Sequence, residues 1–212
     1  MRKNLYLVGA GDFGREMESW LVLLPGFNEE WNIVGYLDNR TTDILNTYPS
    51  DYSIVGIPET FNFTENDFVL LCVSSPVAKK RISSNLKGRV QFFTYIATNT
   101  IIGKFVKIGE GSIICPNVII STNAIIEDFV TINLGSHIGH DCKIGKFSSI
   151  MANVDLGGHV RLGENIFMGT NSTIIPKIEI ESDITIGAGA IVTRNLKKPG
   201  TYFGNPATLI KF

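Results

Sequence analysis

The residues best suited to acid–base chemistry in this chain of 212 residues are its histidines and an adjacent carboxylate. Three histidines are present, at His137, His140 and His159, and Asp141 directly follows the second of them. An imidazole changes its charge near neutral pH, which makes it the natural general base there. His140 and Asp141 are therefore the first candidates for a catalytic pair, and His137 is a weaker one because no carboxylate adjoins it.

A glycine motif near the N-terminus offers a different kind of chemistry. Gly9, Gly11 and Gly14 follow an apolar run at residues 5–8 and precede a stretch that is compatible with a helix. A strand, a glycine-rich turn and a helix can present backbone N–H groups to a phosphate, and Asp38, after the next apolar run, could accept from a ribose or a base. The same glycines would also suit a tight turn with no ligand.

A period of six residues dominates the second half of the chain. One large aliphatic residue recurs without a slip at Ile102, Ile108, Ile114, Ile120, Ile126, Ile132, Ile138, Ile144, Ile150, Leu156, Leu162, Met168, Ile174, Ile180, Ile186 and Val192. Four residues after each stands a small or β-branched residue, as in Val106, Ser112, Val118 and Ala124, and glycine often follows the aliphatic residue directly. This hexapeptide pattern predicts a β-helix in which three sides make a coil of about 18 residues.

The phase of the repeat also sorts the histidines. His140 lies two residues after the inward position Ile138, so we expect it at an outward corner, and His159 lies one coil beyond Asp141. Neither an amphipathic helix nor an ordinary sheet with one wet face has this spacing. An antiparallel sandwich would show strands at irregular intervals. We expect glycine at the corners to serve backbone conformations that a β-carbon disfavours.

Residues 1–97 lack the repeat and predict a small Rossmann-like α/β domain, followed by a β-helix domain over residues 98–212. Strands that alternate with helices favour a parallel sheet. The expected strands cover residues 5–8, 33–37 and 68–73, and the expected helices cover residues 15–24 and 76–86.

Composition points to a soluble cytoplasmic protein. The net charge is −1 and no Lys/Arg block is present, which argues against a nucleic-acid partner. No apolar run is long enough to span a membrane, and the chain has no recognisable export signal. Cys72, Cys115 and Cys142 are unclustered and are best interpreted as small buried apolar residues in a reducing compartment.

The chain resembles the bacterial sugar acyltransferases of the sialic acid O-acetyltransferase type. Within them it is most similar to the nucleotide-sugar N-acetyltransferases that act on 4-amino sugars of the bacillosamine and perosamine pathways. The motifs that carry the resemblance are Val8-Gly9-Ala10-Gly11-Asp12-Phe13-Gly14, Gly35-Tyr36-Leu37-Asp38-Asn39, Asn133, Gly139-His140-Asp141-Cys142-Lys143-Ile144-Gly145 and Gly204-Asn205-Pro206-Ala207. The resemblance covers nearly the whole chain.

This resemblance implies a homotrimer of left-handed β-helices that binds acetyl-CoA in the groove between subunits. His140 matches the general base that takes a proton from the sugar amine, and Asp141 matches its acidic neighbour. The positions that match coenzyme contacts are Gly158, which matches a backbone donor to the thioester carbonyl, together with Thr170, Ala188 and Ser149. At Ser149 many relatives carry a second histidine, so this contact must be replaced or lost.

The same resemblance assigns the amino-sugar substrate and its nucleotide. The positions that match contacts to the nucleotide are Gly11, Asp12, Phe13, Asp38, Asn39 and Gly56, and Asn133 matches a sugar contact beside the base. The resemblance implies no resident metal. It leaves open which nucleotide and sugar are bound, the length of the acyl chain, and whether transfer is to nitrogen or to oxygen.

Other classes of function predict different chemistry from the same residues. Sugar O-acetylation is the nearest alternative, since one base can deprotonate either nucleophile. A metal-dependent lyase on a β-helix would need three histidines that converge across a subunit boundary, for which His137, His140 and His159 are available. A non-catalytic protein that binds nucleotide sugars would release no thiol from acetyl-CoA.

Overall fold

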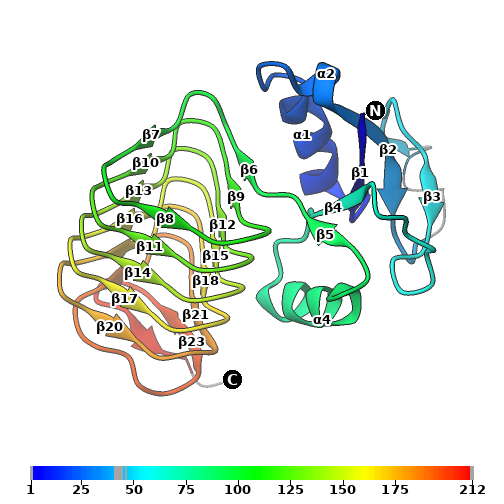
Figure 1. Ribbon diagram of the computed structural model, residues 1–212. Helices are drawn as coiled ribbons and strands as arrows, with labels where there is room; N and C mark the ends of the chain where they lie inside the picture. The colour runs from blue at the N-terminus through cyan, green and yellow to red at the C-terminus, as the bar shows by residue number, and fades with distance from the viewer. Residues whose placement is uncertain (1, 41–44, 46, 211–212) are drawn as a thin grey trace.

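The computed structural model describes residues 2–40, 45 and 47–210. Two regions are evident in Figure 1: a small parallel sheet with helices, and a long parallel β-solenoid of the left-handed type. The solenoid confirms the interpretation of the hexapeptide repeat. None of the helices in the described part of the chain is both long and apolar enough to cross a membrane.

The N-terminal region contains a five-stranded sheet in the order β3-β2-β1-β4-β5, with every pair parallel. Its strands are β1 (Lys3–Val8), β2 (Trp31–Leu37), β3 (Ile54–Gly56), β4 (Asp67–Leu71) and β5 (Gln91–Phe92). Its helices are α1 (Asp12–Leu21), α2 (Phe27–Glu30) and α4 (Pro76–Leu86). The sequence had predicted three of these strands and both longer helices, although α1 begins at Asp12 instead of residue 15. The prediction omitted β3, β5 and α2.

Side chains that alternate along β1 build two separate cores. Leu5 and Leu7 pack with Met17 of α1, whereas Tyr6 and Val8 pack with Leu86 of α4. Successive side chains of a strand point to opposite faces, so the two helices cover opposite faces of the sheet. All strands run the same way, and their carboxyl ends therefore meet at one edge.

The solenoid has three faces. Each face is a ladder of short parallel strands, and each strand pairs with the strand one coil further along the chain. The first face contains β7 (Ile101–Ile102), β10 (Ile119–Ile120), β13 (His137–Ile138), β16 (Asp155–Leu156), β19 (Thr173–Ile174) and β22 (Ile191–Val192). The second face contains β8 (Lys107–Ile108), β11 (Ile125–Ile126), β14 (Lys143–Ile144), β17 (Arg161–Leu162) and β20 (Glu179–Ile180). The third face contains β6 (Tyr95–Ile96), β9 (Ile113–Ile114), β12 (Thr131–Ile132), β15 (Ser149–Ile150), β18 (Phe167–Met168), β21 (Ile184–Ile186), β23 (Gly200–Phe203) and β24 (Thr208–Leu209), the last pairing antiparallel with β23.

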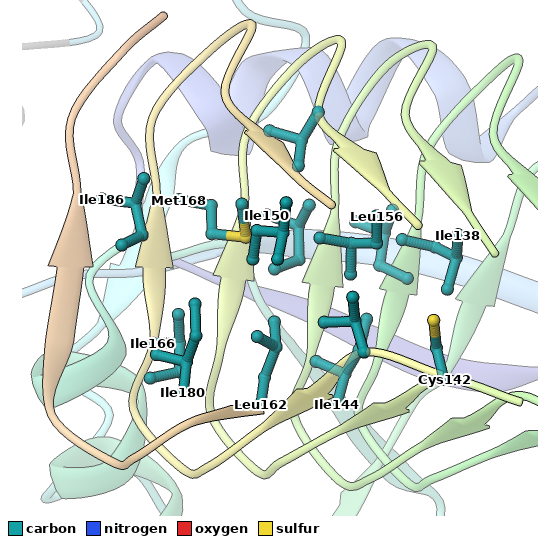
Figure 2. Close-up of a cluster of buried hydrophobic side chains, with 14 of the residues drawn as sticks. Ile138, Cys142, Ile144, Ile150, Leu156, Leu162, Ile166, Met168, Ile180 and Ile186 are labelled. Carbon is teal, nitrogen blue, oxygen red and sulfur yellow. The ribbon is translucent and has the colours of Figure 1, made fainter. Parts of the chain in front are cut away.

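The interior of the solenoid is filled by the residues of the repeat. From Ile114 to Val192 every aliphatic position of the period is buried, and the small residues between them are buried as well. Figure 2 shows labelled members of this column, including Ile138, Ile150 and Leu156, pointing into the interior from successive strands. The first position, Ile102, is 40% exposed because no coil covers the β7 end of its face.

The backbone conformation at the corners differs from the one that the sequence predicted for their glycines. The glycines that follow the aliphatic residues do not supply the left-handed backbone. A β-carbon at Gly139 would lie 2.7 Å from the backbone carbon of Gly157 in the next coil, so these glycines allow coils to approach closely. The left-handed positions are mostly occupied by other residues, such as Asn123 with φ 61° and Asp141 with φ 60°. Asn and Asp tolerate this conformation better than most residues.

The N-terminal region packs against the third face of the solenoid. Lys79 of α4 is 1% exposed, and its Nζ donates to Thr131 Oγ1 at 3.1 Å and to the Ser148 carbonyl at 2.9 Å. Tyr95 and Ile113 of the third face share a core with the α1 side of the small sheet. Figure 1 likewise shows the helices and the small sheet on the side of β6, β9 and β12.

Candidate active site

His140 and Asp141 lie in the turn that joins β13 to β14, which we call the base corner. His140 Nδ1 lies 2.7 Å from Asp141 Oδ2. An ionised carboxylate can only accept, so Nδ1 carries the proton and Nε2 keeps a free lone pair. The His140 and Asp141 side chains are 55% and 36% exposed. The pair confirms the outward corner that the repeat predicted and presents a base to solvent.

Gly158 provides the surface against which the imidazole rests. A β-carbon at Gly158 would lie 2.5 Å from His140 Nε2, so only glycine leaves room for the ring in this orientation. The Gly158 carbonyl accepts from the Lys177 N–H, whereas the Gly158 N–H has no partner among the described residues. The free lone pair of the base therefore lies beside an unused backbone donor.

Two residues of the adjoining coils hold Asp141 in place. Asn123 Nδ2 donates to Asp141 Oδ1 at 3.1 Å, and His159 Nε2 lies 3.8 Å from Asp141 Oδ2. The hydrogen bond with His140, and then the one from Asn123, lower the pKa of Asp141 below its ordinary value. Asp141 is consequently ionised at neutral pH and fixes the orientation of the imidazole.

His140, Asp141 and His159 also form a group that could hold a metal ion. One ligand atom from each lies within 4.8 Å of the others, and the rings of His140 and His159 are perpendicular with centroids 5.0 Å apart. His137 does not join this group. It lies on the first face, where its Nδ1 contacts Asp155 Oδ1 of the neighbouring strand at 2.9 Å.

A cavity of about 400 Å³, which we call the strand-end cavity, lies at the carboxyl ends of β1, β2 and β4. Five residues predicted to bind the nucleotide line it, namely Gly11, Asp12, Phe13, Asp38 and Asn39. Gly56 does not line the cavity, but its carbonyl accepts from the Asp38 N–H at 3.0 Å at the end of β2. The cavity has the size of a small-molecule site and lies at a strand edge where parallel α/β sheets bind ligands.

Arg40 neutralises Asp38 inside this cavity. Arg40 Nη2 donates to Asp38 Oδ2 at 2.6 Å, and the Ala10 N–H donates to the same oxygen at 2.7 Å. Burial raises the pKa of Asp38, but the hydrogen bonds from Arg40 and Ala10 outweigh it and leave the pKa below its ordinary value. The guanidinium also lies over the glycine motif, since a β-carbon at Gly11 would be 3.3 Å from Arg40 Nη2.

A second cavity of about 460 Å³, the junction cavity, lies between the start of α4 and the solenoid. Ser74 and Ser75 line both cavities, so the two adjoin. On the solenoid side the junction cavity is lined by Asn165, whose buried Oδ1 has no hydrogen-bond partner, and by Asp183. This surface offers acceptors to a ligand that carries hydroxyl or amino groups.

The other predicted site residues lie away from the base corner. Asn133, Thr170 and Ala188 follow strands of the third face, in the turns that lead back to the first face. Thr170 and Ala188 are exposed, whereas Asn133 is 9% exposed and its Oδ1 accepts from the Leu134 N–H. Ser149 is fully buried in β15, and its hydroxyl has no hydrogen-bond partner within the described part of the chain.

Sequence reasoning missed several residues around the two sites. Asn123 could have been found, because it stands one coil before Asp141 in the same corner position. Arg40, Ser75 and Glu59 could not, since they lie in irregular turns of the N-terminal region with no repeat to place them.

Comparison with solved structures finds proteins of the same fold over nearly the full length. The acetyltransferase domain of PglB from Neisseria gonorrhoeae superimposes with a TM-score of 0.87 at 22% identity, covering 99% of this chain and 100% of that domain. PerB from Caulobacter crescentus, in complex with CoA and GDP-perosamine, superimposes with a TM-score of 0.86 at 20% identity, covering 98% of this chain and 97% of the PerB chain. WeeI from Acinetobacter baumannii superimposes with a TM-score of 0.83 at 24% identity, covering 97% of this chain and 99% of the WeeI chain.

Two further structures show the perosamine N-acetyltransferase of Caulobacter crescentus with one histidine replaced by asparagine or alanine, again with CoA and GDP-perosamine. No family profile matches the chain, and no curated protein matches it in sequence. At these identities the likeness establishes a shared fold.

Proposed function

We propose that the protein is an acetyl-CoA-dependent N-acetyltransferase that acts on the 4-amino group of a nucleotide-linked deoxysugar. The observation that carries the proposal is the His140–Asp141 pair resting on Gly158, in a fold shared over nearly the whole chain with the acetyltransferase domain of PglB and with PerB. The pair supplies a base, the free Gly158 N–H supplies an oxyanion donor, and the strand-end cavity supplies a place for the nucleotide.

The proposed reaction is direct acyl transfer. His140 Nε2 takes a proton from the sugar amine as its nitrogen attacks the thioester carbonyl, forming the C–N bond and a tetrahedral oxyanion. The Gly158 N–H donates to that oxyanion. The C–S bond then breaks, and the thiolate of CoA leaves with a proton returned by the imidazolium. Asp141 keeps the imidazole oriented and offsets its positive charge.

Residues 1–97 would act as a Rossmann-like domain that holds the nucleotide. The N-terminus of α1, at Gly11, Asp12 and Phe13, attracts phosphate through its backbone N–H groups. Arg40, although paired with Asp38, would offer further N–H donors beside them. The sugar would then extend past Ser74 and Ser75 toward the junction cavity, which adjoins the nucleotide site. Residues 98–212 would form the acyltransferase domain.

The geometry of a single chain supports a homotrimer. The base corner joins the first and second faces, whereas the N-terminal region covers the third face, on the opposite side of the prism (Figure 1). A nucleotide in the strand-end cavity therefore cannot bring its sugar to His140 of the same chain. In this proposal a second copy supplies the base through a head-to-tail contact, which forms a closed ring when its rotation is a whole fraction of a turn, as in a trimer.

The same arrangement would form the coenzyme groove. Thr170 and Ala188 are exposed at the corner between the third and first faces, so a neighbouring copy could place them opposite Gly158 of the base corner. Asn133 would approach the sugar in the same way. Ser149 stays outside this proposal because its side chain is buried under the N-terminal region.

The test is release of CoA thiol from acetyl-CoA in the presence of UDP-, GDP- and dTDP-linked 4-amino-4,6-dideoxysugars. Matched sugars with a 4-hydroxyl group separate nitrogen from oxygen transfer. We expect thiol release with an amino sugar and none with its hydroxyl counterpart. Transfer to the hydroxyl sugar alone would favour an O-acetyltransferase, and no release with any sugar would favour a non-catalytic binding protein.

The group formed by His140, Asp141 and His159 motivates one rival, a metal-dependent lyase. Incubation with a chelator followed by dialysis distinguishes the two functions. A base that acts through a free imidazole keeps its rate, whereas a metal enzyme loses activity and regains it with added Zn²⁺.

A further inference from the structure

A carboxylate without a partner among the described residues lines the strand-end cavity. Glu59 lines the cavity just after β3, and its Oε2 atom is buried without a hydrogen-bond partner. None of the described hydrogen bonds or ion pairs involves Glu59. The other carboxylate on this side, Asp38, already accepts from Ala10 and Arg40. A buried acceptor left empty is costly, so the Glu59 carboxylate gains stability when its side chain turns into the cavity and a ligand donates to both oxygens.

The distribution of charge in the strand-end cavity determines which part of a bound nucleotide lies at Glu59. The N-terminus of α1 makes the β1–β2 side attractive to a diphosphate, and Arg40, although paired with Asp38, has a further N–H group, Nη1, beside the glycine motif. Asp12 contacts Arg15 at 2.6 Å and Asp38 contacts Arg40, so both carboxylates there are neutralised. Glu59 has no such partner and repels phosphate. The strand order β3-β2-β1-β4 then places the nucleoside toward β3 and the sugar toward β4.

We propose that Glu59 hydrogen-bonds to the nucleobase and selects guanine, so that the amino-sugar substrate is linked to GDP. Guanine presents two adjacent donors, N1–H and the 2-amino group, which a carboxylate accepts with both oxygens. Uracil and thymine present a single N–H between two carbonyl oxygens, and these oxygens repel a carboxylate. This inference rests on the proposed function of the strand-end cavity as a nucleotide site.

The experiment is calorimetric titration of the full chain with GDP, IDP, UDP and dTDP. We expect GDP to bind about 10- to 100-fold more tightly than UDP or dTDP, the range for hydrogen bonds to a charged group. IDP, which lacks the 2-amino group, should fall between them. Glu59→Gln should remove the preference for GDP and leave UDP within about twofold. Glu65→Gln, an exposed carboxylate outside the cavity, is the matched control and should change nothing.

Two outcomes overturn the inference. UDP or dTDP binding as tightly as GDP to the wild-type chain would do so, and that comparison needs no variant that folds. Equal weakening of all four nucleotides by Glu59→Gln would instead mean that Glu59 contacts the ribose. Thiol release with a UDP-linked amino sugar would leave the proposed function standing while this inference falls.

Discussion

Two histidine–aspartate pairs lie on the solenoid, and they are alike in nearly every local measure. His140 and Asp141 are 2.7 Å apart, His137 and Asp155 are 2.9 Å apart, and all four side chains are at least one-third exposed. The difference lies in what surrounds them. His137 projects from the flat first face with its partner one strand away, whereas His140 lies at a corner beside the free N–H of Gly158.

The comparison indicates that the groups around a histidine, more than its pairing with an aspartate, decide whether it can serve as the proposed base. A surface ion pair contributes little by itself. A base is useful where a donor for the developing oxyanion lies within reach of the same reacting atom. The base corner offers both groups, and the face with His137 offers only one. Substitutions at the two pairs, and then within the base corner, test this distinction.

The largest expected effect follows from His140→Ala. Removal of the base should lower kcat by about 10²- to 10⁴-fold, the range for general-base catalysis, while binding of acetyl-CoA changes little. Initial rates of thiol release and titration with acetyl-CoA measure the two effects. His137→Ala is the matched control and should keep its rate within about twofold. Equal losses in both variants would remove the distinction between the pairs.

Gly158→Ala should have the next largest effect. The new methyl group would lie 2.5 Å from His140 Nε2, so the imidazole must turn away from its present position. A displacement of about 1 Å can cost on the order of 10²-fold in kcat. Steady-state kinetics measures this loss, and an unchanged melting temperature shows that the coil still stacks. A normal kcat would mean that the orientation of the ring is not needed.

Asp141→Asn should cost less, about tenfold in kcat. Asparagine can still accept from the Nδ1–H and tolerates the φ of 60° at this corner, but it no longer offsets the charge of the imidazolium. The measurement is kcat at neutral pH, with Asp155→Asn as control at the other pair. A loss as large as that of His140→Ala would assign Asp141 a greater role than orientation and charge.

Lys79→Met tests the junction between the two regions through stability. Burial lowers the pKa of Lys79 well below its ordinary value of 10.5, so between the lowered and the ordinary pKa the unfolded chain binds a proton that the folded chain does not. The free energy of unfolding should therefore rise with pH in that interval, by up to about 1.4 kcal/mol per pH unit. Urea unfolding at several pH values should show that Lys79→Met lacks this rise. Lys80→Met, at an exposed neighbour, should keep it.

How much the sequence predicts differs between the two regions. The repeat fixes inside and outside for every residue of a coil, so the sequence alone placed His140 and Asp141 together at a corner and His159 one coil beyond. The N-terminal sheet has no such period. The sequence located its main strands, but the positions of Arg40 and Glu59 depend on how irregular turns fold around the glycine motif.

The separation of the strand-end cavity from the base corner could not be predicted either. It follows from Lys79 anchoring α4 on the third face, a contact between residues 52 positions apart. A buried lysine bonded to a threonine and a carbonyl has no signature in the sequence. The role of the corner glycines was also predicted wrongly. They allow neighbouring coils to approach closely, as at Gly139, and this contact is visible only in the stacked structure.

The most direct test of the account is complementation between two inactive variants. His140→Ala lacks the proposed base, and Asp38→Ala lacks the carboxylate that binds Ala10 and Arg40 in the strand-end cavity, so each should be nearly inactive alone. If the base of one copy serves the cavity of another, mixed oligomers regain activity in about a quarter of their sites, by random assortment around a closed ring. Recovery of thiol release after unfolding and refolding the two variants together is the predicted result. A mixture as inactive as its components would contradict the claim that two chains build each active site.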